Sequence, residues 1–135
     1  MNTYHPETGQ WTTDADRYHA VVDSDPDYRA LADDVHDEPE RAWPVLLRLI
    51  SELDDETRGH AGAGPLQSFV WANAAAFIGR IEARARADDA FRRCLAEVEL
   101  TDGQLPPDVQ QRLVAASGGR IHVYPAEIDH DDGVR

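Results

Sequence analysis

The sequence predicts a mainly α fold: a compact bundle of five or six helices around a buried central helix at about residues 65–86. Three observations support this prediction. Apolar residues recur every three or four positions through most of the chain, as they do on one face of a helix. Asp-Pro, Gly-Pro and Pro-Pro-Asp sequences mark helix starts. The stretch near 120–124 alternates as a strand does, so one short strand is expected there.

Length and composition fit a single domain. The chain has 135 residues, of which 41% are hydrophobic, and this is enough for one core. Residues 1–12 contain Gly and Pro and show no periodicity, so we expect a flexible N-terminal arm that Trp11 anchors to the body. A single helical domain is expected at 13–125, and an acidic flexible tail at 126–135.

The first half of the domain contains three helix starts. A short helix is expected over about 14–22, and Asp25, followed by Pro, marks a second helix. Asp37 is expected to cap a third, amphipathic helix, in which Pro44 kinks the first turns or delays the start. The apolar side of this third helix comprises Trp43, Leu46, Leu47, Leu49, Ile50 and Leu53.

The central helix is expected to open at Gly64 and Pro65. Projected at 100° per residue, its large apolar side chains fall in one wide sector, which predicts a core face. The opposite sector is small, which lets another helix approach closely, and a helix apolar nearly all round is buried. The small sector comprises Ser68, Ala72, Ala75, Ala76, Gly79 and Ala83.

The last third predicts two helices and the strand. The helices are expected over about 89–100 and 106–116, with Cys94 on the inward face of the first as a buried, inert thiol. Because a lone strand needs a partner, residues 120–124 are expected to form an extended tail or an edge that pairs with another chain.

Charge narrows the function classes. Thirteen basic residues, all Arg, oppose twenty-six acidic ones, giving a net charge of −13. Such a chain repels nucleic acid and anionic membranes unless its arginines are clustered. Since it has neither a signal peptide nor an apolar run of about 20 residues, we expect a cytoplasmic protein. A single cysteine excludes an intramolecular disulfide and a cysteine zinc site, and neither a metal nor a cofactor is expected.

No recognised catalytic signature is present, and we expect the protein not to be an enzyme. The segment Gly62-Ala63-Gly64-Pro65-Leu66-Gln67 runs into a helix N-terminus, where amide groups can bind an anion. Pro65 removes one donor and the acidic residues 54–56 are unfavourable for phosphate. The favoured interpretation is therefore a turn that needs a positive φ and close packing.

Polar residues near the central helix offer weaker candidates. Gln67, Asn73 and Arg80 lie in or beside its apolar sector, where they either form a structural network, the favoured interpretation, or line a groove. Trp71 lies at the margin of that sector and either anchors a partner protein or closes the core rim. The candidate ligand or partner-binding residues are His60, a possible general base with no nucleophile paired to it in sequence, Gly64, Gln67, Trp71, Asn73 and Arg80.

Residues 38–100 resemble a family of small bacterial helical proteins of unknown function. The resemblance rests on Glu40 with Trp43, the 62–67 segment, Ile81-Glu82 with Ala85, and Phe91-Arg92 with Leu95. The family pattern has Gly-Pro-Leu followed by Glu, where this chain has Gln67, so any catalytic or ionic role of that acid is lost here. The resemblance implies a compact helical domain and no particular activity.

We therefore expect a non-enzymatic, acidic protein-interaction module whose partner is a basic protein. In its most concrete form this is an inhibitor or immunity-type protein that covers a basic site on a toxin or nuclease. One alternative is a small-ligand-binding protein or enzyme with a groove near the Gly64-Pro65 helix start. Another is a self-associating structural protein, a homodimer formed through the small sector of the central helix or the strand at 120–124.

Overall fold

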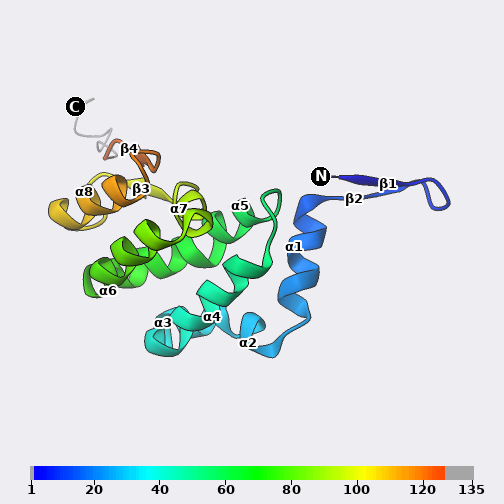
Figure 1. Cartoon of the computed structure of the whole chain (residues 1–135), viewed down its shortest axis with the longest axis horizontal. Coiled ribbons are helices and arrows are strands. Elements are labelled where there is room, and N and C mark those ends of the chain that lie inside the picture. The colour runs from blue at the N-terminus through cyan, green and yellow to red at the C-terminus, as the bar shows by residue number, and fades with distance from the viewer. Residues whose placement is uncertain (1, 127–135) are drawn as a thin grey trace, which may run out of the picture.

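The computed structural model describes residues 2–126 and has the predicted mainly α fold with little strand. Helices form one body, and a thin two-stranded element projects from it (Figure 1). The helices are α1 (Asp14–Asp23), α2 (Pro26–Arg29), α3 (Leu31–Asp37), α4 (Pro39–Glu52), α5 (Arg58–Ala61), the π-helical η1 (Gly62–Leu66), α6 (Gln67–Ala87), α7 (Asp89–Leu95) and α8 (Pro107–Ala116). The strands are β1 (Thr3–His5), β2 (Gln10–Thr12), β3 (Glu99–Thr101) and β4 (His122–Tyr124). Of the predicted tail, residues 127–135 lie outside the described residues.

The first two helices start at side chains that cap them, Thr13 and Asp25, whereas α3 and α4 have no side-chain cap. Asp25 accepts a hydrogen bond from the amide of Asp27 and caps α2, as predicted. The expectation that Asp37 caps α4 is wrong, because Glu38 occupies the N-cap position and Pro39 the first turn. A proline at the first position needs no amide partner, so the helix begins without a side-chain cap. Pro44 lies inside α4 and does not delay its start.

The core gathers on one face of α6, which packs against α3, α7, α8 and η1. Trp43 from α4 lies among three phenylalanines, Phe69, Phe77 and Phe91, with ring centroids 5.3, 5.9 and 5.8 Å from its own. Such tilted and edge-on aromatic pairs bury much apolar area. This cluster joins α4, α6 and α7 in one core.

The small face of α6 differs from expectation. No helix in residues 2–126 covers it: Ala72, Ala76 and Gly79 are exposed, and a Cβ placed on Gly79 would meet nothing within 4 Å. The small side chains therefore form the solvent side of an amphipathic helix. Alanine has the highest helix propensity and serves on a solvent-facing side without any packing requirement.

The close approach predicted for the Gly-rich segment occurs between η1 and α7. A Cβ on Gly62 would lie 2.4 Å from the carbonyl oxygen of Cys94 and 2.7 Å from the Cβ of Glu97. The expected positive φ is absent, since both glycines of this segment have a negative φ, −64° at Gly62 and −112° at Gly64. The Cys94 thiol is buried as predicted, and burial raises its pKa to about 12.

The predicted strand forms, and its partner lies in the same chain. β4 pairs in parallel with β3, with Leu100 opposite Val123. The expected helix over 89–100 is therefore wrong beyond Leu95, where α7 ends. Residues 97–101 alternate between polar and apolar types, and burial follows this alternation, with Val98 and Leu100 buried. That two-residue period is typical of a half-buried strand.

Candidate protein-interaction surface

The projecting element is a β-hairpin at the N-terminus. β1 pairs antiparallel with β2, which places Tyr4 opposite Trp11 with ring centroids 5.0 Å apart. Tyr4 is 47% exposed and Trp11 60% exposed. The expectation that Trp11 anchors the arm to the body is therefore wrong: its ring packs on its cross-strand neighbour, and the hairpin points away from the helices (Figure 1).

The hairpin could have been recognised from its turn. The run Pro-Glu-Thr-Gly stands between two short segments that contain aromatic residues and threonine, which is typical of a hairpin with a longer loop. Gly9 adopts a φ of 70°, and its amide donates to the carbonyl oxygen of His5 at 2.8 Å. Only glycine takes this conformation without strain, so the turn explains the position of Gly9.

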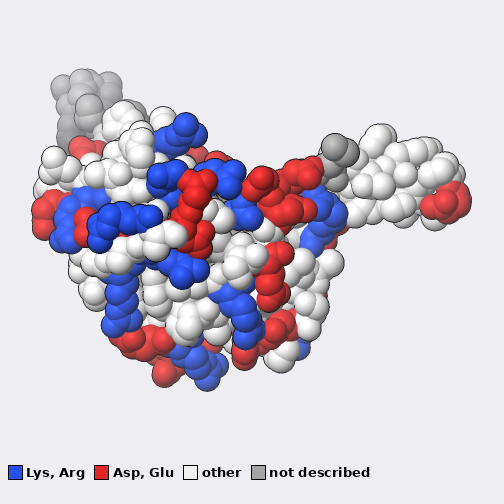
Figure 2. All heavy atoms as spheres, viewed as in Figure 1, with Lys and Arg blue, Asp and Glu red and all other residues white. Residues whose placement is uncertain are grey.

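Acidic side chains gather where the hairpin meets the body (Figure 2). We call this group the acidic shoulder; it comprises Asp14 and Asp16 of α1 and Asp54, Asp55 and Glu56 of the α4–α5 loop. Arg17 joins its two parts, because its guanidinium lies 2.7 Å from Asp14 Oδ1 and 2.8 Å from Asp54 Oδ2. The five carboxylates of the shoulder outnumber the three arginines that pair with them, Arg17, Arg58 and Arg93, so the shoulder keeps a negative charge.

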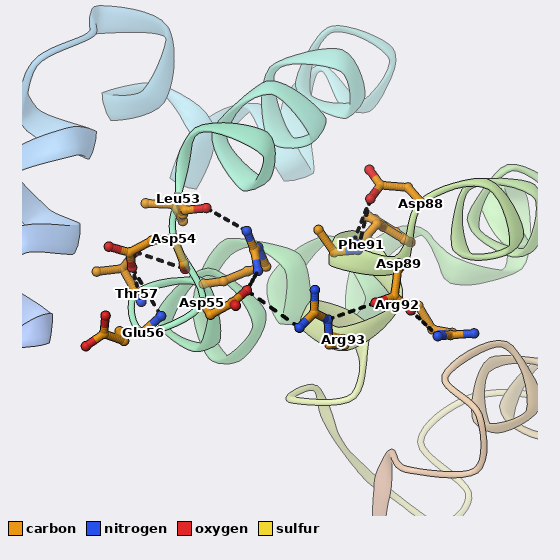
Figure 3. Close-up of polar contacts among 12 residues, drawn as sticks. Leu53, Asp54, Asp55, Glu56, Thr57, Asp88, Asp89, Phe91, Arg92 and Arg93 are labelled. Carbon is orange, nitrogen blue, oxygen red and sulfur yellow. Dashed lines mark hydrogen bonds and ion pairs between the residues drawn. The ribbon is translucent and has the colours of Figure 1, made fainter. Parts of the chain in front are cut away.

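The loop half of the shoulder is held by Asp54. Its Oδ1 accepts hydrogen bonds from the amides of Glu56 and Thr57, at 3.1 and 2.9 Å, and from the Thr57 hydroxyl at 2.7 Å (Figure 3). The Thr57 hydroxyl and then the Arg17 guanidinium hold the pKa of Asp54 well below its usual range. Asp54 therefore stays ionised at pH values at which ordinary carboxyls take up a proton.

Asp55 ties the shoulder to α7. It forms ion pairs with Arg58 and with Arg93, the latter at 3.6 Å, and Arg93 continues to Asp89 at 3.1 Å (Figure 3). Arg58 also donates to the carbonyl oxygen of Leu53 at 2.7 Å, which closes the loop onto the end of α4. These contacts fix the backbone of the α4–α5 loop and therefore the positions of its carboxylates.

Charge is divided unevenly along the chain. Residues 14–56 carry fourteen carboxylates and four arginines, a net charge of −10, whereas residues 80–120 carry seven of each. The acidic excess therefore belongs to α1–α4 and the loop that follows. A potential concentrated on one part of a surface steers a partner of opposite charge to that part.

Two of the residues singled out from the sequence hold β3. The Gln67 side-chain oxygen accepts a hydrogen bond from the amide of Glu99 at 2.8 Å, and the Trp71 indole donates to the carbonyl oxygen of the same residue at 2.9 Å. They lie one turn apart on α6 and bracket one strand residue. A Glu in place of Gln67 can accept the same bond, so this contact does not need the amide.

Asn73 and Arg80 make separate contacts farther along α6. The Asn73 amide donates to the carbonyl oxygen of Val35 at 2.7 Å, near the end of α3. Arg80 is exposed and forms a two-fold contact with Glu40, at 2.7 and 3.0 Å. These are contacts between helices, and they do not converge on a common space.

His60 and Gly64 lie on the other side of the helix start. The exposed His60 stacks on Tyr18, with ring centroids 5.7 Å apart. Gly64 lines an apolar hollow of about 310 Å³ with Tyr18, Leu31, Val35 and Pro65. A groove thus exists near the Gly64-Pro65 helix start, but of the six sequence candidates only Gly64 lines it.

Two broader features are absent from residues 2–126. No helix there combines the length and hydropathy needed to cross a membrane. Nor do three or more His, Cys, Asp or Glu side chains lie together as a metal-binding group in this part of the chain.

Comparison with known proteins gives a family without an activity. No curated protein and no solved structure matches the chain significantly. A family of unknown function, DUF6869, matches residues 19–121, a region that begins within α1 and contains the loop half of the acidic shoulder but not the hairpin. Because the match covers most of the 135 residues, the chain belongs to this family of unknown function.

Proposed function

We propose that this protein is a protein-interaction module that binds a basic partner through the β1–β2 hairpin and the acidic shoulder. The exposed Tyr4–Trp11 pair carries this proposal. Tryptophan and tyrosine are over-represented among residues that dominate binding energy. Here both are exposed, and they lie on a hairpin that projects from the body (Figure 1). An inhibitor or immunity-type role against a basic toxin or nuclease is the concrete form.

The aromatic pair and the charge have complementary roles. Carboxylates of the shoulder raise the rate of encounter with a basic surface, and this contribution weakens as salt is added. The two rings then supply apolar area, which is insensitive to salt. If the partner has a basic catalytic site, the acidic surface covers that site and blocks access of the substrate, as a competitive inhibitor does.

The test is affinity capture from the native host with three matched forms of the protein. The first is wild type; the second carries Tyr4→Ala and Trp11→Ala; the third carries Asp54→Asn, Asp55→Asn and Glu56→Gln. A control variant, Asp33→Asn, Asp37→Asn and Glu38→Gln, removes the same number of charges from α3 and the residue that follows it. We expect a basic protein that wild type and control retain and that both surface variants capture in smaller amounts.

The salt dependence separates the two contributions. Raising the ionic strength should weaken capture by wild type and should change capture by the shoulder variant less, because the steering charges are already gone. An equally acidic partner, or one that all four forms retain equally, would contradict the proposal. If capture recovers a second copy of the chain, the self-associating alternative replaces it, and light scattering will then give a dimer mass.

The hollow beside Gly64 favours a second candidate function, binding of a small apolar ligand. Its walls are mainly aliphatic and aromatic, and its volume of about 310 Å³ falls at the small end of ligand sites. Gly64→Leu would fill it, since the nearest atom to a Cβ there is the Tyr18 hydroxyl at 3.7 Å. An apolar fluorescent probe that binds wild type and not Gly64→Leu would support this function; equal binding would reject it.

A further inference from the structure

The arginines of the C-terminal part line two adjoining hollows. The first, about 320 Å³, lies between the end of α6 and α8 and is bordered by Arg86, Arg92 and Arg112, with one carboxylate, Glu82. The second, about 330 Å³, is bordered by Arg92, Arg93 and Arg120, with one carboxylate, Asp89. Arg92 and Gly118 line both, so the two hollows lie next to each other.

These hollows differ in charge from the rest of the protein. Five arginines face two carboxylates, although the whole chain has a net charge of −13. Figure 2 shows basic side chains gathered over the part of the molecule formed by α6, α7 and α8. The positive charges of arginines that line the same hollow repel one another, and an anion bound between them offsets this repulsion.

Not all of the five are neutralised by the protein. Glu82 holds Arg112 at 2.9 and 2.5 Å, and Asp89 holds Arg92 and Arg93. Within residues 2–126, neither Arg86 nor Arg120 forms an ion pair with a carboxylate. Each hollow therefore contains one guanidinium whose donors are available to a ligand.

We propose that these hollows bind a small phosphorylated molecule of nucleotide size. The planar donor fork of arginine matches the oxygens of a phosphate, and the arginines come from α6, α7, α8 and the loop after α8. The lining of the first hollow includes three alanines, Ala85, Ala115 and Ala116, whose apolar surface suits the organic part of such a molecule. Each hollow falls at the small end of ligand-site volumes, about 300–1,000 Å³.

A small anion fits better than a nucleic acid. Nucleic-acid binding depends on many phosphate contacts along an extended basic surface. Here the basic residues enclose two hollows, and the acidic excess on α1–α4 repels a long polyanion. A compact di- or triphosphate places its charge within the hollows.

The test is calorimetric titration of the full chain with ADP, with adenosine as the probe that lacks phosphate. We expect saturable binding of ADP, weakened by salt, and none of adenosine. Arg86→Gln and Arg120→Gln should each weaken ADP binding by about tenfold or more, because a charge-assisted hydrogen bond is lost. Arg29→Gln, which changes net charge equally on α2, is the matched control and should bind ADP as wild type does.

Thermal unfolding checks that each variant is folded, and since Arg86 and Arg120 are exposed, their Tm values should match that of wild type. Equal weakening by Arg29→Gln would show general ionic attraction and overturn the proposal. So would equal binding of adenosine, or no binding of ADP. Tighter binding of a single-stranded oligonucleotide than of ADP would overturn the choice of a small ligand.

Discussion

Residues 2–126 contain two sheets of two strands each, and the two sheets are stabilised in different ways. The β3–β4 pair is parallel and joins segments more than twenty residues apart, with Leu100 only 1% exposed. The β1–β2 pair is an antiparallel hairpin with its two aromatic rings exposed. Two strands alone are marginally stable in water, so a short sheet persists when something packs on it.

This difference in packing suggests different roles for the two sheets: β3–β4 is part of the folded body, and the β1–β2 hairpin offers a surface for binding. Three side chains stabilise β3–β4: Gln67 and Trp71 bracket Glu99, and the hydroxyl of Tyr124 donates to the Glu99 carboxylate at 2.9 Å. The hairpin meets the body at α1, where the Asn2 side chain accepts a hydrogen bond from the amide of Asp14 at 3.0 Å. An exposed aromatic pair on a projecting element is the kind of surface that a partner would cover.

The largest effect that would sharpen this contrast is expected for Leu100→Ala. Truncating this buried strand residue should lower the free energy of unfolding by about 2–5 kcal/mol, because it leaves a cavity under β3. Trp11→Ala removes a larger side chain from the hairpin, yet should change the stability by about 0.5 kcal/mol or less. Urea unfolding followed by circular dichroism measures both, and similar losses for the two variants would contradict the contrast.

The next effect concerns the approach of η1 to α7, the helix that leads into β3. Gly62→Ala should cost about 1–3 kcal/mol, since its Cβ would collide with the backbone at Cys94. Gly79→Ala, on the open face of α6, should instead stabilise by about 0.5–1 kcal/mol because alanine is the better helix former. Thermal melts of the pair should move in opposite directions; a shift of the same sign would refute the assigned packing.

A smaller loss of stability is expected when the hydrogen bond between Gln67 and β3 is removed. Gln67→Ala removes the acceptor for the Glu99 amide and should cost about 1 kcal/mol. Gln67→Glu keeps an acceptor at the same place and should cost less. Hydrogen exchange of the Glu99 amide reports this directly: faster exchange in Gln67→Ala than in Gln67→Glu is expected, and equal rates would exclude the bond.

The smallest effect is the pH dependence of the shoulder. The pKa of Asp54 is lowered in the folded protein, so its contribution to stability is present above the unfolded value of about 3.8 and declines as the pH falls below it. Wild type should therefore be more stable than Asp54→Asn at neutral pH, and the gap in Tm should narrow in acid. If the difference in Tm between wild type and Asp54→Asn instead widens below pH 3.8, the pKa of Asp54 is not lowered in the folded protein.

The helices were predictable because their signals are local. Asp25 with Pro26, and Pro39, place two helix starts through capping and fixed φ alone. The sequence predicts helix as far as residue 100 because Val98 also continues the apolar stripe of α7. The pattern at residues 97–101 fits both a helix and a strand, and the partner strand β4, which decides in favour of a strand, lies more than twenty residues away.

The candidate surface was less predictable than the helices. Trp11 was expected to pack on the body, since a large aromatic side chain is usually covered, and its actual neighbour depends on the register of the hairpin. The shoulder unites α1 with a loop some forty residues later, and only the tertiary fold places Arg17 between them. Gln67, Asn73 and Arg80 were rightly seen as polar groups on the core helix, but their partners could not be derived from spacing.

Hydrogen–deuterium exchange of the chain alone and with its captured basic partner tests the central claim most directly. Binding through the hairpin and shoulder predicts slower exchange at residues 3–12 and 54–56. Little change is expected at β3, which Gln67 and Trp71 of α6 already hold, or at β4, which pairs with β3. Protection confined to β3, β4 or the arginine-lined hollows, with the hairpin unchanged, would contradict it.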